Sequence, residues 1–206
     1  VSTIPNLGYG RIPDVYTSLE FERLGSTTGC TAGKIVKKDG TQPKRIGILH
    51  CVGSLDERYN PYCSQICCEY AMKFGVLAKE GMHDVEVVNF YKELTLSGKG
   101  FEKLAAKTKE EGARFIRIDR PNDVNVTNGD GGIRVAYTKN GAAESETVDM
   151  LVLCPALRPA KGTEKLVDLR TLKCSADGFL AEENMSLETT GTTTDGVYIA
   201  GTARGP

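Results

Sequence analysis

Hydrophobic residues in the middle of the chain alternate between strand-like and helix-like patterns. Short apolar runs predict strands at residues 45–51, 84–91 and 114–119. The segments between these runs, 64–80 and 101–111, are predicted helices, and each is followed by a glycine. This order of elements predicts an α/β fold with a parallel sheet and right-handed crossovers.

A second set of apolar stretches predicts a hairpin and a returning strand. Residues 124–127 and 133–138 flank Asn128-Gly-Asp-Gly-Gly, which is a strong signal for a hairpin turn. We expect this hairpin to form a smaller antiparallel layer beside the parallel sheet. The apolar stretch 146–154 is predicted to return as one further strand, and residues 164–169 have a short helical pattern.

The two ends of the chain are predicted to be less regular than the middle. Residues 1–44 are interpreted as a linker with one short helix, which a capping box at Thr17–Glu20 opens. Residues 45–158 are interpreted as a Rossmann-like module, and residues 159–206 as a mixed, polar segment. Residues 197–200 are a predicted buried strand that runs into a glycine turn. Because such a turn normally leads into a helix that faces a ligand, we interpret the chain as part of a longer protein.

Composition and charge limit the possible functions. The chain has 206 residues, of which 40% are hydrophobic and 26% charged, and its net charge of −1 does not favour nucleic acid or an anionic membrane. No apolar run approaches the length of a membrane span, and no signal peptide is visible. Seven cysteines, an odd number, are expected as free or metal-bound thiols in a reducing cytoplasm.

Cys51, Cys63, Cys67 and Cys68 lie within eighteen residues, where a predicted strand ends and a predicted helix begins. Four thiolates fit either a zinc ion or an iron–sulfur cluster. Only Cys63 and Cys67 have the spacing of a zinc knuckle, and two adjacent cysteines reach one site only if that site is large. The spacing therefore favours an iron–sulfur cluster, whose negative charge also suits a helix N-terminus.

The remaining candidate residues have simpler interpretations. Cys154 and Cys174 are interpreted as buried free cysteines. His50 and His83 are interpreted as structural residues at strand ends rather than as ligands. A vicinal disulfide or redox dithiol at Cys67–Cys68 is an alternative, but it leaves the other two clustered cysteines unexplained.

The strand-to-helix turn lacks the usual nucleotide fingerprint. A nucleotide-binding Rossmann unit carries G-x-G-x-x-G at this position. Here the turn has a single glycine, Gly53, before the cysteine loop. The sequence therefore does not predict NAD binding at this turn, and a pyridine-nucleotide-dependent disulfide reductase is the weakest of the functions considered.

The sequence resembles the A subunits of the heterodisulfide reductases, including relatives in sulfate reducers and other anaerobes. The segments that carry the resemblance run in family order: Asp14–Leu24, Cys51–Ser54, Tyr62–Cys68, Asp149–Leu153, and Asp195–Gly201 with Gly205-Pro206. The resemblance implies a three-layer, Rossmann-like α/β domain of the FAD/NAD(P)-disulfide oxidoreductase type, similar to thioredoxin reductase. It also implies that residues 159–206 are the returning segment of an incomplete FAD domain.

The resemblance further implies two cofactors. It implies that one [4Fe–4S] cluster near FAD is ligated by Cys51, Cys63, Cys67 and Cys68. It also implies that Gly201 and Thr202 touch the flavin, although related flavoenzymes have an aspartate at the second of these positions. The family's N-terminal flavin half and its ferredoxin-type cluster motifs are absent from this sequence, so FAD binding is expected to require the missing half.

Two functions of different kinds follow from these observations. The first is an electron-transfer module of a heterodisulfide-reductase-like complex, an oxidoreductase component that passes electrons to or from a flavin. The resemblance implies other subunits of such a complex, ferredoxin, and hydrogenase or formate dehydrogenase components as partners. The second function is a non-catalytic assembly module whose four-cysteine site holds zinc or is empty.

Overall fold

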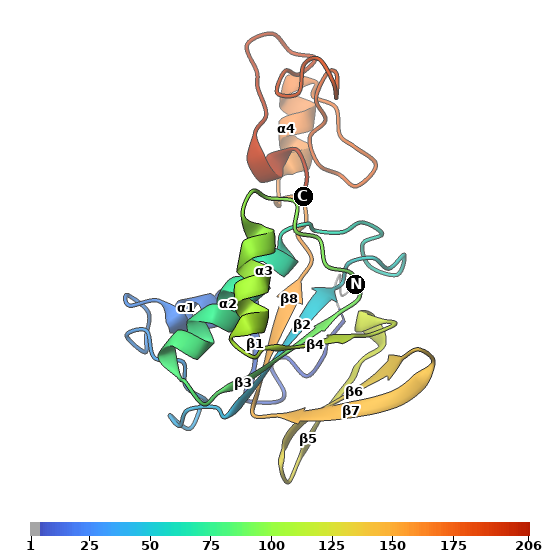
Figure 1. The fold of residues 1–206 in the computed structure, drawn as a ribbon. Coiled ribbons are helices and arrows are strands. Elements are labelled where there is room, and N and C mark those ends of the chain that lie inside the picture. The colour runs from blue at the N-terminus through green and yellow to red at the C-terminus, as the bar shows by residue number, and fades with distance from the viewer. Residues whose placement is uncertain (1–4) are drawn as a thin grey trace. The chain divides into compact units, whose positions relative to one another are not determined.

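A five-stranded parallel sheet forms the centre of the first of two units in the chain (Figure 1). The computed structural model describes residues 5–206, and the first unit ends at Ala156. Neighbouring strands pair in parallel in the order β1-β8-β2-β3-β4, which confirms the predicted parallel sheet. The strands are β1 (Val15–Thr17), β2 (Arg45–Val52), β3 (Glu86–Tyr91), β4 (Arg114–Arg117) and β8 (Met150–Pro155).

Both faces of this sheet are covered, which explains its continuous apolar strands. One face packs against helices α1 (Ser18–Gly25) and α2 (Cys67–Gly81), where Ile48 and Phe74 belong to one buried cluster. Helix α3 (Phe101–Glu110) packs beside α2. The other face carries a second buried cluster, to which Phe90 of β3 and Tyr137 of the second sheet contribute, with ring centroids 5.4 Å apart.

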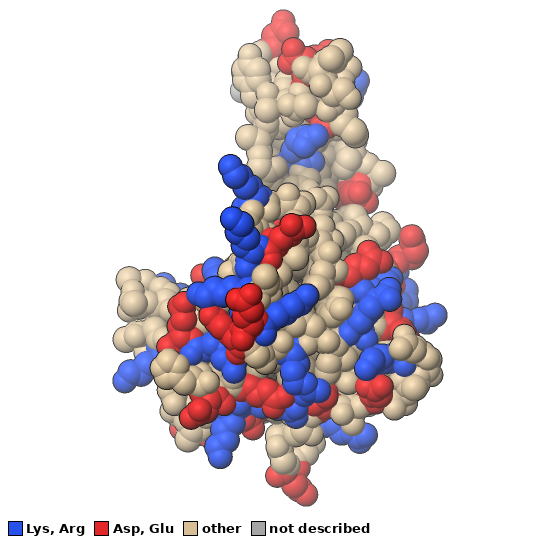
Figure 2. Space-filling view, in the orientation of Figure 1, with Lys and Arg blue, Asp and Glu red and all other residues tan. Residues whose placement is uncertain are grey.

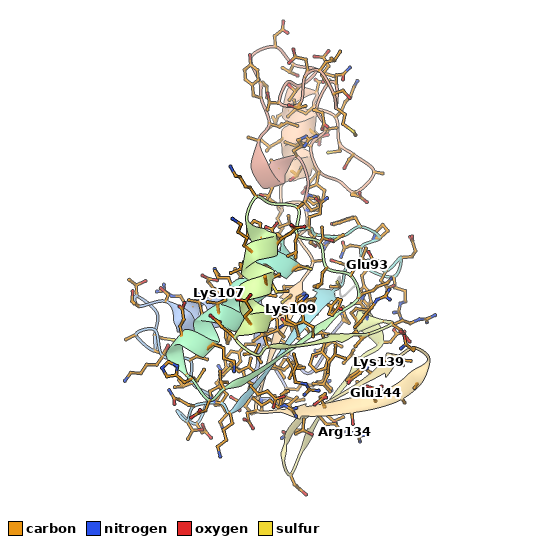
Figure 3. The ribbon with its side chains drawn as sticks, in the orientation of Figure 1. Glu93, Lys107, Lys109, Arg134, Lys139 and Glu144 are labelled. Carbon is orange, nitrogen blue, oxygen red and sulfur yellow. The ribbon has the colours of Figure 1, made fainter. Side chains whose placement is uncertain are left out.

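The second sheet is antiparallel, in the order β5-β6-β7, and it confirms the predicted hairpin. Lys139 and Glu144 form an ion pair across its second turn, with an N–O distance of 3.8 Å (Figure 3). Its strands are β5 (Asn125–Gly129), β6 (Gly132–Lys139) and β7 (Ala142–Val148).

The single strand expected at 146–154 is wrong, because Asp149 divides this stretch between the two sheets. β7 ends before Asp149 and β8 begins after it. The Asp149 carboxylate accepts hydrogen bonds from the backbone N–H groups of Lys44 and Arg45, at 2.8 and 2.9 Å. These bonds fix the chain where it crosses from the antiparallel sheet to the parallel one.

The stretch 1–44, expected as a linker with one helix, contributes two elements to the first unit; its first four residues lie outside the described part. Thr17 and Glu20 form the predicted capping box at the start of α1. Phe21 of α1 packs against Phe74 of α2, with ring centroids 4.9 Å apart. β1, however, was not predicted, because three residues are too few to show a strand period.

The second unit, Leu157–Pro206, has few buried apolar residues. It contains helix α4 (Thr163–Arg170), as the sequence predicts, and the short 3₁₀ helix η2 (Gly201–Ala203). The strand expected at 197–200 is wrong, since Tyr198 makes only an isolated bridge and is 74% exposed. Four further large apolar side chains of this unit are also exposed: Leu166, Leu169, Met185 and Leu187.

The charged side chains and the apolar character of the helices were compared with what the composition predicts. Basic and acidic side chains are interspersed over the first unit on the face drawn in Figure 2. Within residues 5–206, none of the helices combines the length and apolar character needed to cross a lipid bilayer.

Candidate metal centre at the carboxyl end of the parallel sheet

Cys51 lies at the carboxyl end of the central strand β2, in an unusual backbone conformation. Its φ of 58° places it in the left-handed region, which costs a non-glycine residue about 1–2 kcal/mol. The pairing of β2 with β8 is irregular between Leu49 and Val52, which flank it. This irregularity interrupts the alternation of β2 and leaves the Cys51 thiol in contact with Cys67 of α2.

The loop after Cys51 folds back on itself and returns Cys63 to the same end of the sheet. The Asn60 amide donates to the carbonyl of Gly53 at 2.6 Å. The hydroxyls of Ser54 and Ser64 hydrogen-bond at 3.0 Å, and both side chains are buried. Cys63 is therefore positioned by contacts within the loop rather than by a helix or a strand.

Asn122 ties this loop to the neighbouring part of the sheet. It lies in the 3₁₀ helix η1 (Pro121–Asp123), which follows β4. Its Oδ1 accepts from the backbone N–H of Gly53 at 2.6 Å, and its Nδ2 donates to the carbonyl of Ser54 at 3.1 Å. One buried side chain thus fixes both residues that begin the cysteine loop.

Cys67 and Cys68 open helix α2, and both are buried. The helix starts without a side-chain cap, so its first N–H groups have no side-chain acceptor from the N-cap residue. Tyr70, three residues after Cys67, lies on the same face of the helix. The helix begins three residues later than the predicted segment 64–80, and its N-cap residue Ile66 is 43% exposed.

The connection between β3 and α3 closes the other side of the site. The Cys68 thiol donates to the carbonyl of Glu93, with a sulfur–oxygen distance of 3.5 Å. The Thr95 hydroxyl lies 3.7 Å from the sulfur of Cys63. The four cysteines are therefore surrounded by residues that the chain supplies from two crossover segments.

Backbone amides are directed at the sulfurs. The N–H of Gln65 donates to the Cys63 sulfur at 3.3 Å. The N–H groups of Lys92 and Thr95 face the sulfurs of Cys51 and Cys68, and each favours the thiolate form. Such donors stabilise negative charge on sulfur, as they do around protein-bound thiolate clusters.

The pKa values of the buried thiols reflect their proximity. A hydrogen bond with Cys67 and burial raise the pKa of Cys51 well above its ordinary value. The contact with Cys51 lowers the pKa of Cys67, but Cys68 and burial outweigh it and raise this pKa to about 12. The hydrogen bond with Cys67 lowers the pKa of Cys68 despite burial, while the charges of Cys51 and Cys63 oppose this. A cation bound to the sulfurs of Cys51 and Cys67 would offset the burial that opposes their ionisation.

The donor set suits a soft metal or an iron–sulfur cluster, because all four groups are thiols and backbone N–H groups point at three of them. Among the described residues, no group of three or more histidine, cysteine, aspartate or glutamate side chains has the arrangement of a metal-ion site.

The structure also places Cys154, Cys174 and His50, which the sequence analysis interpreted as structural residues. Cys154 is buried, as predicted, but Cys174 is exposed, because it lies in the sparsely packed second unit and makes only an isolated bridge to Leu180. His50 is fully buried on β2, and its Nε2 hydrogen-bonds the Oδ1 of Asn89 at 3.0 Å. Burial lowers the pKa of His50.

Gly201 and Thr202, the residues predicted to touch a flavin, lie in the short helix η2 of the second unit. Gly201 has a φ of 57°, and both residues are exposed. The backbone N–H of Leu180 donates to the carbonyl of Ala203 at 2.9 Å, which holds this turn against its own unit. An ion pair of 2.8 Å between Arg204 and Glu182 adds to this contact.

No family model matches the chain, but curated relatives do. The chain is 44% identical over 208 residues to the A subunit of the H(2):CoB-CoM heterodisulfide,ferredoxin reductase of Methanothermobacter thermautotrophicus. It is 35% identical over 208 residues to the iron-sulfur A subunit of the CoB–CoM heterodisulfide reductase of Methanocaldococcus jannaschii. Each match covers 97% of the chain but 31% of the relative, so the chain spans about a third of these proteins.

Two solved structures share the fold. A variant of the HOCl-induced flavoprotein disulfide reductase of Escherichia coli, in complex with copper(II), covers 100% of the chain and 37% of its own, with a TM-score of 0.54 and 16% identity. The thioredoxin reductase of T. acidophilum covers 95% of the chain and 51% of its own, with a TM-score of 0.51 and 14% identity. The chain thus has the predicted α/β fold of the FAD/NAD(P)-disulfide oxidoreductases.

Proposed function

Because the chain belongs, over the segment it spans, to the family of heterodisulfide reductase A subunits, we propose that it is an electron-transfer module of such a complex. Its four clustered cysteines hold one [4Fe–4S] cluster, and the module passes electrons to or from a flavin. A bound cluster of this type supplies one-electron redox chemistry. The chain's own residues bind it, shield it from water and set its electrostatic surroundings.

The observation that carries this proposal is the convergence of Cys51, Cys63, Cys67 and Cys68 at the carboxyl end of the parallel sheet. Three of these four residues are buried, and Cys63 is partly buried. Backbone N–H groups aimed at the sulfurs and the uncapped start of α2 both favour an anionic occupant. The carboxyl ends of strands are also where open α/β sheets bind their ligands.

The flavin belongs to the same proposal. We propose that Gly201 and Thr202 contact FAD, with the rest of its site supplied by the part of the A subunit that lies outside this chain. The second unit supports this, since it buries few apolar residues and exposes Leu169, Leu187 and Tyr198 by 74% or more. A segment of this kind gains a core when it packs against another part of a flavin domain.

The partners are proposed from the names of the relatives. Those names describe subunits of heterodisulfide reductases that act with H2, formate or ferredoxin. We propose that the module exchanges electrons with other subunits of such a complex, and through them with ferredoxin and with a hydrogenase or formate dehydrogenase.

The proposal is tested by measuring iron, sulfide, zinc and flavin in one anaerobic preparation. We expect about four iron and four sulfide per chain and a broad visible absorption that bleaches on reduction. Cys51→Ser and Cys63→Ser should each lose most of the iron. Cys30→Ser, which changes an exposed cysteine, is the matched control and should retain it. Stoichiometric zinc without iron or sulfide would exclude the proposal.

The alternative, a non-catalytic assembly module with zinc or nothing at the cysteines, has one observation in its favour. The exposed apolar side chains of the second unit fit a role in assembly. The two functions differ in the metal content of the wild-type chain, because an electron-transfer module holds reducible iron and an assembly module holds zinc or no metal. A wild-type chain without iron or sulfide that binds a flavoprotein partner, and binds it equally well after all four clustered cysteines are replaced by serine, would favour assembly.

A further inference from the structure

Among the four cysteines that the proposed function uses, Cys63 is the one that reaches the protein surface. Cys51, Cys67 and Cys68 are each 1% exposed, whereas Cys63 is partly exposed. It lies in the loop between β2 and α2 rather than in either element. A group bound to the four thiols is therefore screened from solvent at three of its ligands and open to it at the fourth.

The two segments that meet at Cys63 carry no charge. The Thr95 hydroxyl lies 3.7 Å from the Cys63 sulfur and brings residues 94–98 beside residues 59–68. Both segments consist of uncharged residues, in a chain of which 26% of the residues are charged. The nearest acidic residues in the sequence, Glu69 and Glu93, stand at the margins of these segments.

These segments form a fixed, partly apolar surface. We define the Cys63 surface as Pro61, Cys63, Gln65, Ile66 and Thr95. Ile66 is 43% exposed, although its side chain is large and apolar. The buried hydroxyls of Ser54 and Ser64 hydrogen-bond at 3.0 Å, and the N–H of Gln65 donates to the Cys63 sulfur at 3.3 Å, so the loop is held in place without a partner. A single exposed apolar residue is ordinary, but here it adjoins an uncharged surface and the one exposed ligand.

The flavin with which the module exchanges electrons is supplied from outside this chain. The glycine-rich dinucleotide turn of a flavin-binding half is absent from the sequence, and the chain spans 31% of the length of its relatives. Electrons must therefore cross the surface of the chain. Cys63 is the ligand at which they reach that surface with least protein in between, because the other three ligands are buried.

We propose that electrons enter and leave the module at Cys63, and that the Cys63 surface is covered, in a complete A subunit, by the flavin-binding part that lies outside this chain. This inference rests on the proposed function. One electron passes between flavin and cluster, so that one is oxidised as the other is reduced, and no covalent bond to the chain forms. Because the surface is uncharged, the covering part meets it through apolar and neutral polar contacts, which salt does not screen.

The point of electron entry is tested with a pair of opposite charges at Ile66. The oxidised, iron-loaded chain is mixed anaerobically with the methyl viologen radical cation, and the rate of cluster reduction is followed by stopped-flow absorption. At low ionic strength, Ile66→Glu should raise the rate about 2–4 times and Ile66→Lys should lower it about 2–4 times, because one charge attracts the cation and the other repels it. The difference should vanish in about 1 M salt, where the Debye length is about 3 Å.

The control and the second readout exclude a general effect of charge. Ala143→Glu and Ala143→Lys place the same charges at an exposed position of β7, in the antiparallel sheet, and should leave the rate unchanged. Redox titration of each variant gives its reduction potential. A negative charge near the cluster lowers this potential and would by itself slow reduction, so a faster Ile66→Glu reports access at Cys63. Equal rates in the two Ile66 variants, or equal changes at Ala143, would overturn the proposal.

The covering part is tested in a full-length A subunit. In this chimera, the present chain replaces the matching segment of the Methanothermobacter thermautotrophicus A subunit, to which it is 44% identical. Hydroxyl-radical footprinting should oxidise Ile66 readily in the chain alone and several-fold less in the flavin-loaded chimera. Unchanged oxidation would exclude the flavin-binding part as the occupant, and so would protection that arises only when ferredoxin is added. The kinetic test uses the chain alone, so it decides the role of Cys63 whether or not the chimera assembles.

Iron and sulfide in the wild-type chain separate this inference from the function on which it rests. If both are absent, the electron-transfer proposal fails, and electron entry at Cys63 fails with it. If the cluster is present and reducible but the charges at Ile66 have no effect on its rate of reduction, the electron-transfer proposal stands and electron entry at Cys63 alone is excluded.

Discussion

Replacing Asn122 with alanine tests how the cysteine loop is held in place. The Asn122 side chain makes three hydrogen bonds to this loop, and the residue is buried. Besides its bonds with Gly53 and Ser54, its Nδ2 donates to a carboxylate oxygen of Asp56 at 3.2 Å. Alanine at this position removes all three bonds and adds none.

The expected loss of stability follows from these contacts. A hydrogen bond contributes about 1 kcal/mol net, and a buried donor left without an acceptor costs about 1–3 kcal/mol. The Gly53 N–H, which Asn122 accepts at 2.6 Å, is the buried donor that loses its acceptor. The bond to Asp56 is only partly buried and contributes less. We therefore expect Asn122→Ala to lower the free energy of unfolding by about 2–4 kcal/mol.

Urea unfolding of the metal-free protein measures this change, with far-ultraviolet circular dichroism as the signal because the chain has no tryptophan. Asn125→Ala, three residues away and exposed, is the matched control and should change stability by less than about 0.5 kcal/mol. In the loaded protein, Asn122→Ala should lose iron to a chelator about 10–100 times more readily. Equal stabilities of the two variants would refute the role assigned to Asn122.

Three further predictions concern the scaffold. A Cβ at Gly75 would lie 2.9 Å from the Cγ2 of Thr108, so Gly75→Ala should lower the free energy of unfolding by up to about 2 kcal/mol. In a Thr108→Ser background, which lacks this methyl group, the same substitution should raise the free energy of unfolding by about 1 kcal/mol. Equal effects in the two backgrounds in urea unfolding would contradict this close approach of helices α2 and α3. Thr17→Ala removes the capping box and should cost about 1 kcal/mol in the same assay, and no measurable change would mean that the cap does not stabilise α1. Partial burial opposes ionisation of Glu20, but hydrogen bonds from Thr17 outweigh it and hold the pKa of Glu20 below its ordinary 4.5. Its contribution to stability is therefore complete above pH 4.5 and is lost as the pH falls through the folded-state pKa, so Glu20→Gln should reduce the loss of stability in acid, and an unchanged acid profile would contradict this.

Much of the first unit was predictable because its signals are local. Helices α2 and α3 follow from the order of apolar segments and closing glycines, and the β5–β6 hairpin from its turn sequence. The capping box at Thr17 predicted the start of α1. Each of these signals lies within one or two turns of the chain, so it can be recognised without the tertiary structure.

The errors share a physical cause, which is that pairing between distant segments decided the outcome. β1 has only three residues and exists through its pairing with β8. The break at Asp149 depends on backbone donors that lie more than a hundred positions earlier in the chain. The expected strand at 197–200 is apolar enough for a strand, yet within Leu157–Pro206 it finds only an isolated partner.

The same division applies to the candidate site. The sequence by itself determined that four thiols gather at a strand-to-helix turn, because residue type and spacing are local properties of 51–68. Only the tertiary structure decided what surrounds them: the amides of Lys92 and Thr95, the Asn122 side chain and the buried Cys154 side chain. These groups come from outside the 51–68 segment and its helix, and they meet the cysteines because crossovers between parallel strands bring the carboxyl ends of β2, β3, β4 and β8 to one edge of the sheet.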